Sequence, residues 1–172
     1  MPTDAPRTIL VVDDEIAVRH SVTRVLEEAG YKVISTNNGR RALEILKEQA
    51  VDVILTDHHM PDLSGIDLLK LVRVRHPQVV RMILTADKQP EIPVRSINES
   101  EVYRFIQKPW SNSDLRTIMH FAFEAIRLER EKQRASQAPG NGKPSVPGAS
   151  PDDPAGLERE LLLLAEDEMR RS

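Results

Sequence analysis

The sequence predicts an α/β fold in which a parallel sheet is covered by helices on both faces. Short apolar runs rich in β-branched residues alternate five times with segments of helical spacing. Turn signals separate them: Gly30 follows the first helical segment, and Pro77 follows the third. Strands that alternate with helices in this way form parallel sheets with right-handed crossovers.

Composition limits the kind of protein that this can be. The chain has 172 residues, of which 40% are hydrophobic and 30% charged, and its net charge is −3. This balance is typical of a globular domain and gives no case for a nucleic-acid or membrane surface. There is no cysteine, which excludes disulfides and thiolate metal sites. No apolar run approaches the roughly 20 residues that span a bilayer, so we expect a cytoplasmic protein.

Five apolar runs are predicted as strands. The run that begins at Val51 is rich in β-branched residues and stops at Asp57, which indicates a strand buried on both faces. Each of the other runs likewise ends at a polar residue or is directly followed by one. The predicted strands are 8–12 (TILVV), 31–36 (YKVIST), 51–57 (VDVILTD), 79–85 (VVRMILT) and 102–108 (VYRFIQK).

Helices are predicted between these strands. Apolar residues at helical spacing indicate helices at 16–29, 40–49 and from Gly65 to His76. The segment 87–100 should also hold a helix, but it contains two prolines. Because proline is tolerated only in a first turn, we expect a short helix that starts near Pro93.

The last helix of the domain carries two apolar stripes. Leu115, Met119 and Ala122 belong to the stripe expected to face the sheet. The second stripe, which includes Phe121 and Leu128, lies on a neighbouring face, and a charged helical segment follows it to about residue 137. Two interpretations stay open. One is a broad buried face with a frayed end, and the other is a helix that pairs with a second copy to form a homodimer.

The C-terminal part of the chain has a different composition. We expect one domain over residues 1–130 and a flexible linker at 138–156, which is dense in Pro, Gly and Ser. Residues 157–172 are predicted as a short amphipathic helix. About 15 residues is marginal for a lone helix in water, so this segment is a candidate for the start of an output region.

Candidate site residues stand at the carboxyl ends of four of the five predicted strands. They are Asp13 and Asp14, Asp57, Thr85 and Lys108. Alone, Asp57 could simply cap the following loop. The carboxyl ends of parallel strands share one edge of a sheet, however, and open α/β sheets bind ligands there. The shared pattern therefore favours a functional site.

The chemistry of this set points to phosphoryl transfer. Clustered carboxylates repel one another, and a hard cation that prefers oxygen ligands, such as Mg²⁺, relieves that repulsion. Lys108 would supply a positive charge for a phosphoryl oxygen, and Thr85 would supply a hydrogen bond. Asp57 is then left as the nucleophile that forms an acyl phosphate.

At these residues the sequence resembles the receiver domain of two-component response regulators. The matching pieces are VVDDE at 11–15, LTDHHMPDLSG at 55–65, LTA at 84–86 and FIQKPW at 105–110. The resemblance covers about residues 6–130. It implies the flavodoxin-like fold, a doubly wound five-stranded sheet of order 2-1-3-4-5.

The resemblance also implies roles for individual residues. Asp57 would accept a phosphoryl group from a sensor histidine kinase. Asp14, Asp57 and the backbone carbonyl of His59 would hold Mg²⁺, with Asp13 acting mainly through a bound water. Lys108 would pair with the phosphoryl group and precede a cis peptide bond. Thr85 and Phe105 would form the switch that responds to phosphorylation.

Two other function classes require features that this sequence does not show. A phosphatase of the haloacid-dehalogenase type needs a second aspartate two residues after the nucleophile, and His59 stands there. A DNA-binding regulator needs a helix-turn-helix after the receiver, and the residues beyond 130 are predicted to hold only a linker and one acidic helix. We therefore expect no nucleic-acid contact by this chain. We also expect a signalling phosphoacceptor rather than a metabolic enzyme. The alternative that stays open is a receiver-like module that binds proteins without being phosphorylated. A zinc site at His58 and His59 is disfavoured because adjacent loop residues are expected to diverge.

Overall fold

The computed structural model describes residues 6–86 and 102–137. The part of the chain that it describes contains five strands and four helices. In chain order these are β1 (Thr8–Val12), α1 (Ile16–Glu28), β2 (Lys32–Thr36), α2 (Gly39–Glu48), β3 (Val53–Asp57), α3 (Gly65–Arg75), β4 (Val80–Thr85), β5 (Arg104–Gln107) and α5 (Asn112–Gln137).

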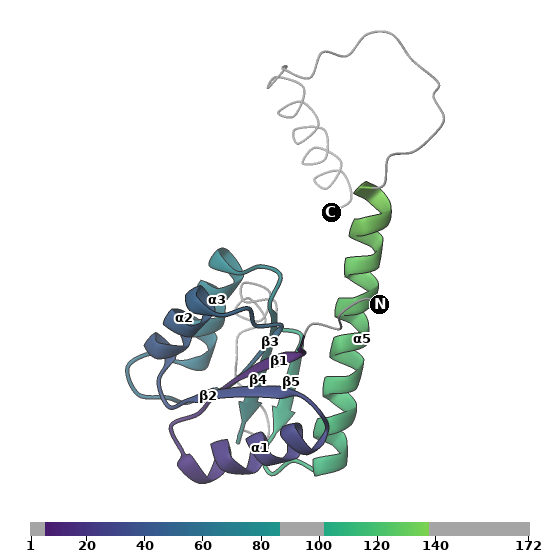
Figure 1. Cartoon of the computed structure of the whole chain (residues 1–172). Coiled ribbons are helices and arrows are strands. Elements are labelled where there is room, and N and C mark those ends of the chain that lie inside the picture. The colour runs from purple at the N-terminus through teal and green to yellow at the C-terminus, as the bar shows by residue number, and fades with distance from the viewer. Residues whose placement is uncertain (1–5, 87–101, 138–172) are drawn as a thin grey trace, which may run out of the picture. The chain divides into compact units, whose positions relative to one another are not determined.

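The strands form one parallel sheet in the order β2-β1-β3-β4-β5 (Figure 1). This order confirms the predicted flavodoxin-like fold. In the register, Val12 at the end of β1 lies opposite both Thr36 and Thr56. The carboxyl ends of the strands therefore meet at one edge, where the chain turns into its loops.

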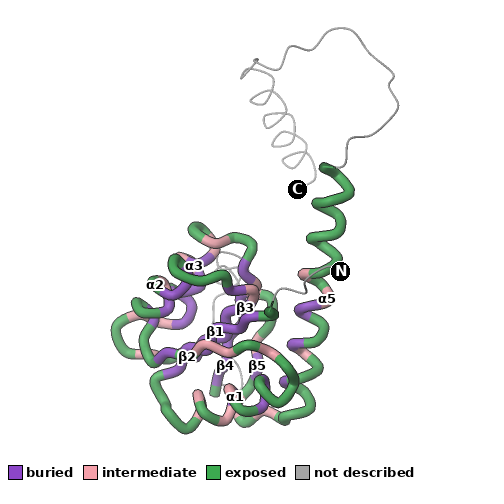
Figure 2. Tube along the Cα trace, in the orientation of Figure 1, coloured by how far each residue is buried: buried purple, intermediate pink, exposed green. Residues whose placement is uncertain are grey.

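The sheet separates two hydrophobic clusters. On one face β1, β3, β4 and β5 pack against α1 and α5, whose buried residues include Leu26 and Met119. On the other face they pack against α2 and α3, with Leu46 and Leu69 among the buried residues. All residues of β1 and β3 are buried, so the middle of the sheet is the most buried part of the tube in Figure 2. Burial on both faces explains why these strands are continuous apolar runs.

Several element boundaries differ from the sequence prediction. The fifth strand is shorter than the predicted 102–108, because Tyr103 and Lys108 lie outside Arg104–Gln107. These two residues continue the pairing as single hydrogen bonds, from Tyr103 N–H to the Arg81 carbonyl (2.7 Å) and from Lys108 N–H to the Thr85 carbonyl (2.7 Å). Helix α2 begins at Gly39, because the Asn38 side chain caps it by accepting from the N–H groups of residues 40 and 41.

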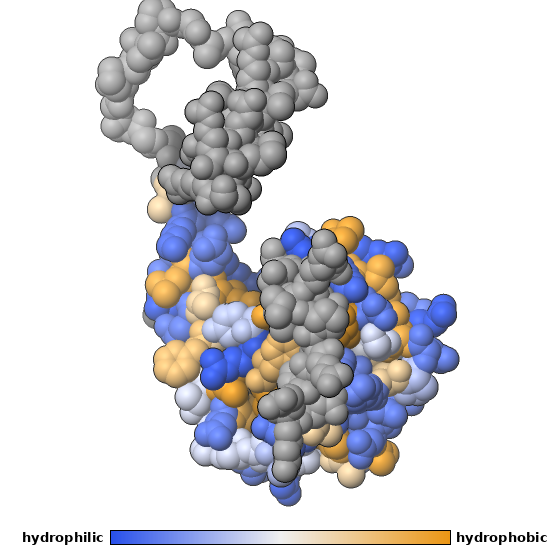
Figure 3. Space-filling model, turned by 180° about the vertical axis from the view of Figure 1, so that it is seen from behind, coloured by the Kyte–Doolittle hydropathy of each residue, from blue (hydrophilic) through white to orange (hydrophobic). Residues whose placement is uncertain are grey.

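Helix α5 packs on the sheet through its first half only. Leu115, Met119, Ala122 and Phe123 are buried, whereas every residue from 127 to 137 is exposed. Phe121 is 61% and Leu128 49% exposed, and Figure 3 shows hydrophobic and hydrophilic atoms intermixed along this helix. Homodimerisation through α5 stays a prediction.

An ion pair connects α5 to the sheet about one turn beyond its packed part. Arg130 Nη2 lies 2.5 Å from Asp52 Oδ1, and Asp52 Oδ2 accepts the Thr8 N–H at 2.9 Å. Thr8 begins β1 and Asp52 directly precedes β3. The exposed segment of α5 therefore starts at the amino-terminal edge of the sheet, opposite to the edge where Asp13 and Asp57 lie.

Some predictions fall outside the described residues. These are the short helix near Pro93, the linker at 138–156 and the amphipathic helix at 157–172. Within residues 6–86 and 102–137, no helix combines the length and the hydropathy that crossing a bilayer requires.

Candidate functional site

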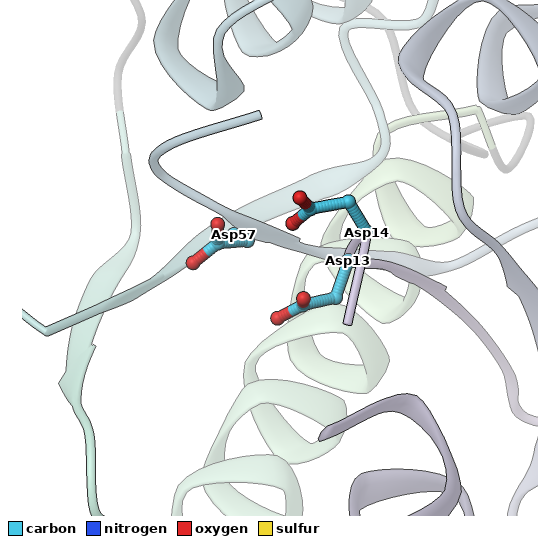
Figure 4. A group of neighbouring side chains, drawn as sticks. All are labelled: Asp13, Asp14 and Asp57. Carbon is cyan, nitrogen blue, oxygen red and sulfur yellow. The ribbon is translucent and has the colours of Figure 1, made fainter. Parts of the chain in front are cut away.

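The register of the central strands brings the predicted acidic residues together. Val12 lies opposite Thr56. Asp13 follows Val12 and Asp57 follows Thr56, so these two aspartates lie side by side. One carboxylate oxygen each from Asp13, Asp14 and Asp57 lies within 4.8 Å of the other two. Figure 4 shows the Asp13 and Asp14 carboxylates pointing toward the side on which Asp57 lies. Asp13 is fully buried and Asp57 is 6% exposed, whereas Asp14 is exposed.

Lys108 connects two of these carboxylates. Its Nζ lies 2.9 Å from Asp57 Oδ1 and 3.0 Å from Asp13 Oδ2, and 4.0 Å from Glu15 Oε1. The side chain of Lys108 is 14% exposed. The hydrogen bond of its N–H to the Thr85 carbonyl positions it next to β4, and the peptide bond that follows, to Pro109, is cis, as expected. Among the described residues, Lys108 is therefore the cation that pairs with both buried carboxylates of this acidic cluster.

The pKa values of two groups reflect this arrangement. Burial raises the pKa of the Asp13 carboxyl above its ordinary value of 3.8, although the Glu15 N–H and Lys108 both act to lower it. Burial acts to lower the pKa of the Lys108 ammonium. Hydrogen bonds to Asp57 and Asp13, with the charges of both acids, outweigh burial, so the pKa of Lys108 lies above its ordinary value of 10.5. One lysine thus leaves the buried Asp13 charge incompletely compensated.

We expect Asp13→Asn to raise the free energy of unfolding by about 1 kcal/mol at neutral pH without divalent cations, because it removes this incompletely compensated charge. The raised pKa means that the folded state binds the Asp13 proton more tightly than the unfolded chain does. The stabilising contribution of protonated Asp13 to the folded state is thus fully present below pH 3.8 and is lost as the pH rises through its raised pKa.

Urea unfolding of both proteins as a function of pH tests this prediction. The advantage of the variant should grow as the pH rises above 3.8 and vanish below it. Addition of Mg²⁺ should stabilise the wild type more than the variant. A variant less stable than the wild type at neutral pH contradicts the prediction.

The other predicted residues lie around this cluster. Thr85 ends β4 and is buried, and the adjacent Leu84 lies opposite Asp57 in the register. Phe105 is half-buried and packs against the cluster of α2 and α3. His59 is exposed in the loop after β3. Thr85 therefore lies at the same edge as the acids, and Phe105 lies in the strand beside it.

Gly65 has a role that the sequence did not indicate beyond a turn. Its N–H donates to the His58 carbonyl at 3.0 Å, which closes the loop between β3 and α3. A Cβ at this position would lie 2.0 Å from the Asp57 carbonyl oxygen. Only glycine therefore permits the start of α3 to approach Asp57 this closely.

Sequence reasoning also missed Arg19 and Glu15. Arg19 Nη1 donates to the backbone carbonyls of Asp13 (2.7 Å) and Asp14 (3.2 Å). Glu15 brings a third carboxylate toward Lys108, at 4.0 Å. The only sequence signal for Arg19 is an arginine one helical turn after an acidic loop, which is too common to identify its contacts.

The donor set fits a hard divalent cation. Three carboxylates within reach of one another supply the oxygen ligands that Mg²⁺ prefers, and the buried Asp13 lacks full charge compensation. The expectation that His58 and His59 diverge is wrong, since their rings lie 4.2 Å apart. In residues 6–86 and 102–137, however, the three aspartates form the only group of three or more candidate ligands.

Comparison with known proteins agrees with the fold. Residues 9–120 match the family described as the response regulator receiver domain. The hydrogenase transcriptional regulatory protein HoxA of Cupriavidus necator is 35% identical over 132 residues, which are 77% of this chain and 27% of that protein. The DNA-binding transcriptional regulator NtrC of Escherichia coli is 30% identical over 134 residues, 78% of this chain and 28% of that protein.

Solved structures of receiver domains match this chain over almost the whole length of the solved chain. The signal receiver domain of an HD domain-containing protein from Pseudomonas fluorescens Pf-5 aligns with a TM-score of 0.67 and 27% identity, covering 71% of this chain and 98% of that one. The chemotaxis response regulator CheY4 of Vibrio cholerae aligns with a TM-score of 0.63 and 28% identity, covering 69% and 99%. The chain thus spans whole receiver domains but little more than a quarter of HoxA and NtrC.

Proposed function

This chain belongs to the family of response regulator receiver domains, and on that premise we propose that Asp57 accepts a phosphoryl group from a sensor histidine kinase. Receiver domains are signalling domains rather than metabolic enzymes. In this proposal the phosphorylated form changes conformation and thereby controls a partner or an output region.

The observation that carries the proposal is the position of Asp57 between charges of both signs. Asp57 is almost fully buried beside Asp13, and Lys108 Nζ lies 2.9 Å from its Oδ1. An oxygen of Asp57 would attack phosphorus while the bond from phosphorus to the donor nitrogen breaks, and the leaving imidazole keeps that electron pair and takes up a proton. Lys108 would then exchange its bond to the free carboxylate for one to a phosphoryl oxygen.

Receiver domains bind Mg²⁺ at an acidic pocket, and in this chain Asp13, Asp14 and Asp57 form a cluster that could hold the ion. We propose the carboxylates of Asp14 and Asp57 and the His59 carbonyl as its ligands, with Asp13 acting through water. When bound, the ion supplies positive charge that offsets the negative charge on the phosphoryl oxygens.

Two further residues would report the modification. The Thr85 hydroxyl lies on the strand next to Asp57 and would donate a hydrogen bond to the phosphoryl group. Phe105, half-buried on β5, would change its packing in response. This proposal assigns Thr85 and Phe105 to the switch.

Intact-mass measurement tests the proposal most directly. The chain is incubated with Mg²⁺ and either acetyl phosphate or phosphoramidate. We expect a mass increase of one phosphoryl group in the wild type and none in Asp57→Asn, whose amide is a poor nucleophile. Removal of Mg²⁺ with a chelator should abolish the increase in the wild type. Absence of the adduct with both donors would instead favour the phosphorylation-independent binding module.

A further inference from the structure

Helix α1 begins without an ordinary side-chain cap. Glu15 occupies the N-cap position, and its side chain makes no capping hydrogen bond. The chain connects helix and loop in another way: Arg19, in the second turn of α1, reaches back over the start of the helix. Its Nη1 donates to the carbonyl of Asp13 at 2.7 Å and to the carbonyl of Asp14 at 3.2 Å.

The two acids depend on this contact to different degrees. Asp13 is also held by its side chain, since Oδ1 accepts the Glu15 N–H at 2.9 Å and Oδ2 accepts from Lys108 at 3.0 Å. Asp14 is exposed, and within the described residues its bond with Arg19 is the only hydrogen bond found for it. The Asp14 carboxylate therefore projects from a backbone that Arg19 holds, so Arg19 helps to set where this carboxylate can reach.

We propose that Arg19 is a positioning residue that fixes the backbone of Asp13 and Asp14 and thereby increases the affinity of the acidic cluster for a divalent cation. The inference rests on the proposed function only in that it takes this cluster to be the cation site. Residues that orient metal ligands, without touching the metal, commonly change affinity 10- to 100-fold when they are replaced.

If Arg19 acted only through its charge, replacing it would change the Mg²⁺ affinity in the opposite direction. The guanidinium is a positive charge close to the cluster, so its removal alone should strengthen the binding of a cation. Loss of positioning should weaken it. The sign of the change in Mg²⁺ affinity after replacing Arg19 therefore distinguishes the two roles.

The test measures Mg²⁺ binding to the whole chain through the shift of the unfolding midpoint with Mg²⁺ concentration, which yields a Kd. Arg19→Gln is expected to raise the Kd roughly tenfold. Arg19→Lys keeps one nitrogen that can donate several hydrogen bonds, so its Kd should lie between those of Arg19→Gln and the wild type. Arg24→Gln, at an exposed position of the same helix, is the matched control and should bind as the wild type does.

The outcomes separate this inference from the function on which it rests. An unchanged or lowered Kd in Arg19→Gln, with normal binding by the wild type, overturns the positioning role alone. A merely structural role would lower the midpoint without Mg²⁺ and leave the Kd unchanged, which also overturns it. If Arg19→Gln does not fold, Arg19→Lys decides by the same criterion. A wild type that binds no Mg²⁺ overturns both this inference and the magnesium dependence proposed above.

Discussion

Replacing Gly65 by alanine is expected to lower the free energy of unfolding by about 3 kcal/mol, near the upper end of the usual cost of overpacking. The added Cβ would lie 2.0 Å from the Asp57 carbonyl oxygen, 3.0 Å from the Asp57 carbonyl carbon and 3.1 Å from His58 Cα. All three are backbone atoms, so no side-chain rotation relieves the overlap. The start of α3 and the end of β3 must separate, which also weakens the Gly65 to His58 hydrogen bond.

Urea unfolding measures this loss of stability, and two other glycines serve as controls. A Cβ at Gly39 would meet Leu63 Cδ2 at 3.0 Å, the end of a flexible side chain, so Gly39→Ala should cost about 1 kcal/mol or less. Gly30 has open space but a φ of +90°, so Gly30→Ala should cost about 1 kcal/mol from backbone strain alone. A Gly65→Ala protein as stable as these controls would show that the approach to Asp57 is not tight.

Since the displaced backbone is that of Asp57, Gly65→Ala should also slow phosphorylation under conditions where the variant is still folded. The mass assay with acetyl phosphate measures this rate. Gly39→Ala, at the start of α2, should be phosphorylated at the wild-type rate.

Replacing Lys108 by methionine should have the next largest effect, a loss of about 2 kcal/mol at neutral pH without divalent cations. Removal of one partner of a fully buried pair costs about 3–5 kcal/mol, and the 14% exposure of the Lys108 side chain reduces the expected value. The physical cause is that Asp13 and Asp57 are left facing each other without the ammonium that lies 3.0 and 2.9 Å from them.

Added Mg²⁺ and a change of pH should both alter the difference in stability between the wild type and Lys108→Met. In the wild type Lys108 already pairs with carboxylates of the proposed cation site, so Lys108→Met should gain more stability from Mg²⁺ than the wild type gains. The pKa of Lys108 is raised, so its contribution is fully present below pH 10.5 and is lost as the pH rises through the raised pKa. The wild type should therefore lose part of its advantage over the variant in alkaline solution.

Thermal unfolding with and without Mg²⁺ measures the effect of Lys108→Met. Lys47→Met, at an exposed lysine in the last turn of α2, is the matched control and should unfold as the wild type does under all conditions. Equal gains from Mg²⁺ in Lys108→Met and in the wild type would show that lysine and cation do not share the carboxylates.

Periodicity in the sequence was sufficient to predict the layers of the fold. The short apolar run, rich in β-branched residues, that ends at Asp57 indicated a strand buried on both faces, and all residues of Val53–Asp57 are buried. The predicted strand ends also indicated which residues would share an edge of the sheet, because the carboxyl ends of parallel strands lie together whatever the register. The order of the strands came from the resemblance to receiver domains, since local spacing carries no information on which strands are neighbours.

Only the tertiary structure decided which of these residues contact one another. Lys108 lies 95 residues after Asp13 in the chain and reaches it at 3.0 Å. The Arg130 to Asp52 pair, which connects α5 to the residue before β3, spans 78 residues. The approach of Gly65 to Asp57 likewise depends on how the loop between β3 and α3 closes. The physical reason is that hydrophobic periodicity describes one element at a time, whereas a hydrogen bond depends on ångström-scale distances between elements, which only their packing sets.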